Sequence, residues 1–136
     1  MALIVDAGPL YAYIDRDDQH HHACRELLEV HPGPLIVPVL VITEVTYLIS
    51  TRLGPEAEVR FLGDLAAGNL IAEHVAAGDW LRIAELVVRY RDLPLGTADA
   101  SVVAAAERLA VVTVATLDHR HFAVVQSTNG PFQLLP

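Results

Sequence analysis

Short apolar runs restrict the fold of this 136-residue chain more than any other feature. They lie at residues 2–5, 35–37, 70–75, 111–116 and 132–135, and they do not follow the alternating pattern of half-exposed strands. Continuous apolar strands are typical of a parallel sheet covered by helices on both faces. Because helical stretches separate the runs, we expect an α/β fold. It should be a three-layer α/β/α sandwich with a central, mostly parallel sheet, and 132–135 should form an edge strand.

Proline and glycine mark the ends of the helices between these runs. The expected helices cover residues 10–14, 20–30, 39–52, 56–67, 78–90 and 98–109, with a short helical turn after Asp118. The composition is 53% hydrophobic and 19% charged, which is not that of a disordered chain. A chain of this length can bury its own core, so we expect a single domain over residues 1–136.

Cysteine content and hydropathy indicate the cellular compartment of the protein. The single cysteine, Cys24, excludes an internal disulfide and is typical of a reducing environment. No apolar run reaches the ~18 residues that cross a bilayer. The apolar N-terminus is not preceded by the basic segment of a signal peptide. We therefore expect a cytoplasmic protein that is not inserted in a membrane.

The charge composition argues against several classes of protein. A net charge of −8 disfavours binding of nucleic acid by simple electrostatic attraction. All nine basic residues are arginine, so the chain lacks the lysine of a P-loop. Phosphoacceptor receivers and haloacid-dehalogenase phosphatases also begin with a strand that ends in aspartate, but they too rely on a lysine. An acidic-site phosphatase is therefore disfavoured.

Two aspartates directly follow expected strands. Asp6 ends the first strand, and Asp118 comes just after the strand at 111–116. The carboxyl ends of parallel strands share one edge of the sheet, where sites of such folds form. Thr116 can add a hydroxyl at the same edge. Each aspartate is also an ordinary turn or capping residue, so neither indicates a site by itself.

Two further carboxylates lie on expected helices. Glu44 stands on an apolar stretch of helix 39–52, with Leu40 and Leu48 four positions before and after it. We expect Glu44 to be partly buried, where a carboxylate must be paired, bind a metal or take up a proton. A salt bridge to an arginine is the alternative. Asp99 lies in the first turn of a helix, where the helix dipole stabilises an acidic side chain. The small residues around it also suggest that this helix packs closely against the sheet.

The carboxylates of Asp6, Glu44, Asp99 and Asp118 would repel one another strongly if they converged without a counter-charge. A divalent cation removes the repulsion, and carboxylate oxygens are ligands that suit Mg²⁺ or Mn²⁺. Two such hydrated cations can activate water and stabilise the leaving oxygen when a phosphodiester is cleaved. The pattern therefore predicts a metal-dependent nuclease, with these four residues as metal ligands and Thr116 as a further catalytic residue.

Four segments, in this order, resemble the motifs of PIN-domain ribonucleases, and more narrowly those of the VapC toxins of bacterial toxin–antitoxin pairs. They are LIVDAGPLYAYID with Asp6, VPVLVITEVTYLI with Glu44, LGTADASVVAAAERL with Asp99, and TLDHRHF with Thr116 and Asp118. Each segment is weakly specific, but the ordered set runs along the whole chain. The resemblance implies a PIN-like fold and places the family's acidic quartet on the four carboxylates.

The resemblance also implies a function. Such toxins use Mg²⁺ or Mn²⁺ to cut tRNA or ribosomal RNA at structured loops, leaving 5′-phosphate and 3′-hydroxyl ends. A cognate VapB-type antitoxin wraps the toxin, and the early helices build either the homodimer or the antitoxin contact. Two alternatives stay open: a housekeeping PIN nuclease of RNA processing without an antitoxin, and a non-catalytic α/β interaction module.

The scarcity of basic residues means that RNA contacts would need a local arginine cluster. The candidates are Arg16, Arg89, Arg91 and Arg120, although each is more ordinarily explained as a solvated surface residue. The resemblance also marks Asp92 as an accessory acid outside the set of metal ligands.

A histidine run and several tyrosines have structural explanations beside functional ones. Within the run His20–His22, His20 lies one helical turn before Cys24, a spacing that zinc can use, but no second pair of ligands accompanies them. Tyr11, Tyr13 and Tyr47 could stack on bases. Aromatic residues on helices beside a sheet more often belong to the core.

Overall fold

The computed structural model describes residues 1–136 and contains five strands and seven helices. Along the chain the elements are β1 (Leu3–Val5), α1 (Ala7–Ile14), α2 (His21–Val30), β2 (Leu35–Pro38), α3 (Val39–Arg52), α4 (Pro55–Ala67), β3 (Ile71–Glu73), α5 (Ala77–Arg89), α6 (Thr97–Leu109), β4 (Thr113–Ala115), α7 (His119–Val124) and β5 (Gln133–Leu135). None of the helices is long and apolar enough to cross a membrane.

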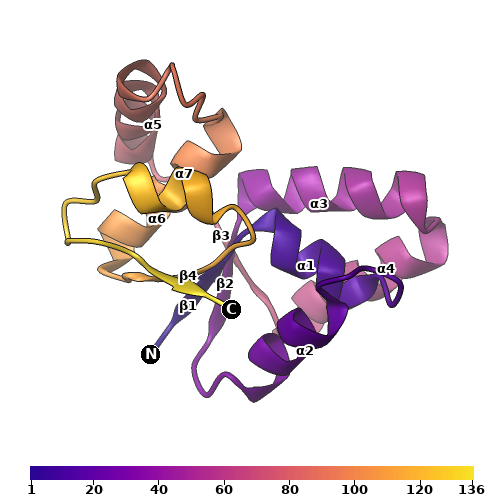
Figure 1. Cartoon of the computed structure of the whole chain (residues 1–136). Coiled ribbons are helices and arrows are strands. Elements are labelled where there is room, and N and C mark those ends of the chain that lie inside the picture. Colours follow the sequence, from indigo (N-terminus) through magenta and orange to yellow (C-terminus); the bar gives the residue numbers. More distant parts are fainter.

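The strands form one parallel sheet in the order β3-β2-β1-β4-β5. Helices α1 to α4 lie on one side of the sheet and α5 to α7 on the other (Figure 1). The predicted three-layer α/β/α sandwich is confirmed. Two strands are shorter than the apolar runs that predicted them by three residues each: β3 covers Ile71–Glu73 and β4 covers Thr113–Ala115. Strands β1 and β5 are each shorter by one residue. Helix α1 starts at Ala7 instead of residue 10, because Pro9 fits within its first turn.

The central strand β1 anchors the core. Its three residues Leu3, Ile4 and Val5 are 0% exposed, which is worth about 1.5–3 kcal/mol for each side chain. The strand pairs with β2 through Leu3 and Ile4 and with β4 through Ile4 and Val5. Burial on both faces explains why its sequence shows no alternation. Asp6 directly follows this strand, so the position of its backbone is fixed by the fully buried centre of the sheet.

Helix α6 is buried along most of its length. Residues 100–106 are all buried, and they are alanine, valine and serine, which let the helix lie close to the sheet. Helix α6 contacts α5, α3, β1 and β2. Two ion pairs tie its far end to the neighbouring α5, from Arg82 to Glu107 at 2.8 Å and from Arg108 to Asp79 at 3.1 Å. The first turn of α6, which carries Asp99, is thereby held at the edge of the core.

Strand order creates one place where the connections leave the sheet in opposite directions. The chain runs from β1 outward through β2 to β3, and then crosses to β4 on the other side of β1. Ligand sites of open α/β sheets lie beyond the carboxyl ends of the strands at such a switch point. Here the residues at that point are the ones that follow β1 and β4.

Candidate active site

Asp6 and Thr116 meet at the carboxyl ends of β1 and β4. The Asp6 N–H donates to the Ala115 carbonyl at 2.9 Å, which extends the strand pairing by one residue. The hydroxyl of Thr116, itself 0% exposed, donates to Asp6 Oδ2 at 3.0 Å. The same hydroxyl accepts the N–H of Asp118 at 3.0 Å. One buried threonine therefore positions the Asp6 carboxylate and the turn that carries Asp118.

The Asp6 carboxyl is the most perturbed acid of the site. Burial is the largest cause and raises its pKa to about 6, from an ordinary value of 3.8. Hydrogen bonds from the Ala7 N–H and Thr116 lower the pKa in part, whereas the charges of Asp99 and Glu44 raise it further. The rise shows that neighbouring negative charges act on a carboxyl that is already buried. A bound cation would relieve both effects.

Asp99 and Asp118 approach each other from the starts of two different helices, α6 and α7. Asp99 is half-buried in the first turn of α6, and Asp118 precedes the first turn of α7. Burial raises the pKa of Asp99, and the charge of Asp118 raises it further, while His121 lowers it. Asp118 Oδ1 accepts the His121 N–H at 3.1 Å and so caps α7. The two carboxylates thus form a second group of acids beside Asp6.

His121 is the site residue that sequence reasoning missed. Its Nδ1 lies 2.7 Å from Asp118 Oδ2 and 3.7 Å from Asp99 Oδ2. The geometry is not that of a hydrogen bond, so the buried Nδ1 has no hydrogen-bond partner. The signal was present in TLDHRHF, because residues three apart at a helix start share a face.

Glu44 reaches the site from α3 but lies off the buried face of the helix, so it is more exposed than its apolar neighbours suggested, although its carboxyl is partly buried as predicted. The buried face of α3 is formed by Val41, Val45 and Ile49. The helix turns Glu44 to the adjoining side, toward the start of α6. Protein atoms on that side raise its pKa through partial burial, and the charge of Asp99 raises it further. Glu44 therefore belongs to the rim of the acidic cluster.

The groups of this cluster suit a divalent cation. Ligand atoms of Asp99, Asp118 and His121 all lie within 4.8 Å of one another. The unpartnered Nδ1 of His121 faces two carboxylates, and the charges of Asp99 and Glu44 both act on Asp6. Such a set of carboxylate oxygens, with one imidazole, fits a hard or borderline cation. The residues that could hold it are therefore the four predicted carboxylates together with His121.

The remaining candidates lie outside the cluster. Asp92 is exposed in the turn between α5 and α6. The four predicted arginines are exposed and form no ion pairs, but Arg89 donates to the Gln126 side chain at 2.9 Å, beyond the end of α7. Arg16 instead lines a hollow with Arg60 between α1 and α4. Arg16 follows α1, Arg89 and Arg91 lie at the end of α5, and Arg120 lies on α7, so the four arginines do not form one cluster along the chain.

The histidine run does not form a zinc pair with Cys24. Cys24 is fully buried, whereas His20 is exposed at the start of α2. His21 contacts the Ala12 carbonyl through Nδ1 at 2.8 Å, and His22 lies 3.9 Å from Glu26. These contacts give the run ordinary structural roles at the start of the helix.

Comparison with known proteins shows the family of the chain. Residues 3–126 match the model of the PIN domain family. The chain is 34% identical to Ribonuclease VapC26 of Mycobacterium tuberculosis over 135 residues, which cover 98% of this chain and 100% of the relative.

Solved structures of lower identity share the fold. VapC20 of Mycobacterium tuberculosis, a toxin that cleaves the sarcin–ricin loop, superposes with a TM-score of 0.77 at 21% identity, covering 82% of this chain and 86% of that one. VapBC2 of Rickettsia felis, bound to a DNA fragment from its promoter, gives 0.73 at 14% identity with 100% of both chains covered. Together with the motif order and the strand-end acids, the family match and the 34% identity lead to one conclusion: this chain belongs to the PIN-domain family, and within it to the VapC ribonucleases.

Proposed function

We propose that this protein is a Mg²⁺- or Mn²⁺-dependent endoribonuclease and the toxin of a type II toxin–antitoxin system. The observation that carries the proposal is the convergence of Asp6, Asp99 and Asp118, with Glu44 at the rim, on the switch point of the sheet. A non-catalytic module gains nothing from keeping a buried aspartate whose pKa is raised to about 6.

Each residue has a distinct part in this proposal. Asp6, Glu44, Asp99 and Asp118 hold the cation, and His121 Nδ1 is placed to complete their set or to orient Asp118. When bound, the cation would polarise the phosphodiester and lower the pKa of a water molecule. The hydroxyl of Thr116 keeps Asp6 Oδ2 fixed and stabilises its ionised form. Asp6 must lose its proton before it can act, so the site favours neutral and higher pH.

The substrate we propose is a structured loop of tRNA or ribosomal RNA, cut to leave 5′-phosphate and 3′-hydroxyl ends. VapC20, which shares the fold, is described as cleaving the sarcin–ricin loop, a ribosomal RNA element. The exposed Arg120 on α7 is the arginine nearest in sequence to Asp118 and would contact a flanking phosphate. Such a substrate implies a cytoplasmic location, and we propose a homodimer as the active form.

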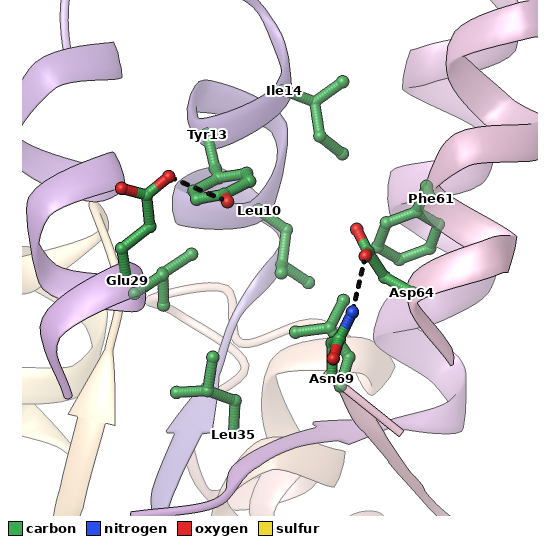
Figure 2. Close-up of a pocket in the computed structure, with 10 residues that line it drawn as sticks. Leu10, Tyr13, Ile14, Glu29, Leu35, Phe61, Asp64 and Asn69 are labelled. Atoms are coloured by element: carbon green, nitrogen blue, oxygen red, sulfur yellow. Dashed lines mark hydrogen bonds between the residues drawn. The ribbon is translucent and has the colours of Figure 1, made fainter. Parts of the chain in front are cut away.

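A groove beside α1 offers a place for the antitoxin. It lies between α1, α2, α4 and β2, has a volume of about 180 Å³, and is walled by apolar side chains that include Leu10, Leu35 and Phe61 (Figure 2). This volume is below the ~300–1,000 Å³ of small-molecule pockets, which suits one side chain of a peptide.

The rim of this groove is acidic. Glu29 is paired with Arg25 at 3.1 Å, but the Asp64 carboxylate forms no ion pair and accepts only the Asn69 side-chain amide at 3.1 Å. We therefore propose that an apolar anchor of the antitoxin enters the groove and that a neighbouring Lys or Arg meets Asp64. Asp64→Lys should weaken antitoxin binding at least about tenfold. Glu26→Lys, an exposed change on α2, should leave binding unaltered.

The nuclease proposal is tested with purified, partner-free protein and total cellular RNA, in Mg²⁺ or Mn²⁺, with end-mapping. We expect a few discrete cuts that disappear with EDTA and in Asp6→Asn and Asp99→Asn, while Asp17→Asn, an exposed control in the loop after α1, cuts like the parent. Equal cutting by all variants, or no metal-dependent cutting, would remove the nuclease and leave an interaction module. Cutting without growth arrest on expression, and without a neighbouring antitoxin gene, would instead indicate a housekeeping nuclease.

A further inference from the structure

The structure separates Tyr47 from the other tyrosines. The hydroxyl of Tyr11 donates to Asp15 at 2.7 Å, that of Tyr13 donates to Glu29 at 3.2 Å, and that of Tyr90 accepts the Gln126 N–H at 2.9 Å. Tyr47 is 68% exposed, and its side chain makes no hydrogen bond and packs against no other ring. A large aromatic side chain held on a rigid helix with its surface free is available to a ligand.

Tyr47 lines an open groove that ends at the acidic cluster. The groove has a volume of about 540 Å³, and its lining residues are Leu40, Thr43, Glu44, Tyr47, Leu48, Thr97 and Ala98. One wall is a face of α3, on which Tyr47 lies one turn after Glu44. The other wall is the first turn of α6, where Ala98 directly precedes Asp99. Both walls therefore lead to carboxylates that act on Asp6.

The lining chemistry matches a nucleoside. The volume falls within the ~300–1,000 Å³ range of sites for small organic groups. One aromatic ring and two leucines offer apolar surface, and the exposed Thr43 and Thr97 add hydroxyl groups. Glu44 is the only charged group in the lining, and the proposed function assigns it to the cation. An RNA strand that places a phosphate at the acidic cluster extends beyond the cluster to its next nucleotide. The groove adjoins the cluster, and the Tyr47 ring gives the base of that nucleotide a surface on which to stack.

We propose that the groove between α3 and the start of α6 is the subsite for the nucleotide next to the scissile phosphate, and that Tyr47 stacks on its base. This inference rests on the proposed ribonuclease function and adds a substrate-binding residue to it. Stacking is tolerant of sequence because every base has a π-face, so Tyr47 supplies affinity and register. The hydroxyls of Thr43 and Thr97 are placed to add a preference among bases.

The test compares Tyr47→Leu, which keeps an apolar side chain but removes the ring, with Tyr47→Phe, which keeps the ring. Trp80→Leu is the matched control, because Trp80 is a 52% exposed aromatic residue on α5 outside the groove. The substrate is an RNA oligonucleotide spanning a cut mapped in total RNA. A second version carries the fluorescent base 2-aminopurine next to the cut.

We expect Tyr47→Leu to raise KM by about 5-fold to 140-fold, which is the ~1–3 kcal/mol of one stacked base at 1.4 kcal/mol per factor of ten. Tyr47→Phe should stay within about twofold of the parent, and so should Trp80→Leu. Quenching of 2-aminopurine fluorescence on binding should be lost only in Tyr47→Leu.

Two results would overturn the subsite while leaving the nuclease in place. One is a Tyr47→Leu protein with the KM and the quenching of the parent. The other is a raised KM that accompanies dissociation of a dimer in light scattering with quenching retained, which would make Tyr47 a self-association residue. If the parent neither cuts nor binds RNA in Mn²⁺, the proposed function fails first and the subsite fails with it.

Discussion

Replacing Asp6 by asparagine should stabilise the metal-free protein while it abolishes cleavage. Asp6 is 6% exposed, and burial raises its pKa to about 6 from the ordinary 3.8. Because the pKa of Asp6 is higher in the folded than in the unfolded state, its protonated form stabilises the fold relative to its ionised form. That stability is fully present below pH 3.8 and is lost as the pH rises through about 6. Asparagine has the same shape, still accepts the Thr116 hydroxyl, and carries no charge to bury.

The magnitude follows from the two pKa values. At 1.36 kcal/mol per pH unit, ionised Asp6 costs the fold about 3 kcal/mol at pH 7.5 and about 1 kcal/mol at pH 4.5. Asp6→Asn should recover up to these amounts in urea unfolding with EDTA present, measured at both pH values. Asp92→Asn removes an exposed charge and should change the free energy of unfolding by less than about 0.5 kcal/mol. Mn²⁺ at about 100 times its Kd should stabilise the parent by about 2.7 kcal/mol, and Asp6→Asn by less.

The reasoning would be refuted if Asp6→Asn were no more stable than Asp92→Asn at pH 7.5. It would also be refuted if the gain were equal at pH 4.5 and 7.5, because a burial cost that depends on ionisation must vanish as the carboxyl takes up its proton.

Three further predictions concern the same framework. Cleavage in Mn²⁺, followed as initial rate against pH, should rise steeply as the pH passes about 6, because the proton on Asp6 competes with the cation; a flat profile would contradict this. Thr116→Val should move that rise to higher pH by about one to two units, since a hydrogen bond to a charged group is worth ~1.5–3 kcal/mol, whereas Thr116→Ser should restore the parent profile. Arg108→Met should lower the free energy of unfolding by about 2 kcal/mol, because the buried Asp79 loses its charged partner. The loss is smaller than the ~3–5 kcal/mol of a fully buried pair because the Arg108 side chain is partly exposed. Unchanged urea denaturation of Arg108→Met would show that the Ala76 N–H alone satisfies Asp79.

The fold and the family were predictable because both depend on local and ordered signals. Continuous apolar strands indicated a sheet buried on both faces, and β1 is 0% exposed throughout. The order of the four motifs indicated the PIN-domain family, which the family match confirms. The roles of the four carboxylates and Thr116 stay predictions, as does the single domain over residues 1–136, although the structure now gives each side chain a position to test.

Other features depended on distances between elements, which a sequence pattern does not contain. Apolar neighbours suggested that Glu44 lies on an apolar face of its helix, but the rotation of α3 against the sheet buries Val41 and Val45 instead and leaves Glu44 at the rim. The contact of His121 with Asp99 joins α7 to α6, and only the crossing of the chain from β3 to β4 brings these helices together.

The sequence by itself determined which segments become strands and helices and which residue types stand at their ends, because hydrophobic burial and backbone preferences act over a few residues. Only the tertiary structure decided which of those ends meet. The strand order places the residues after β1 and β4 side by side, and the buried hydroxyl of Thr116 then joins Asp6 to the turn of Asp118. It also left Tyr47 free beside Glu44 while the other tyrosines were engaged, because exposure is decided by how whole helices pack.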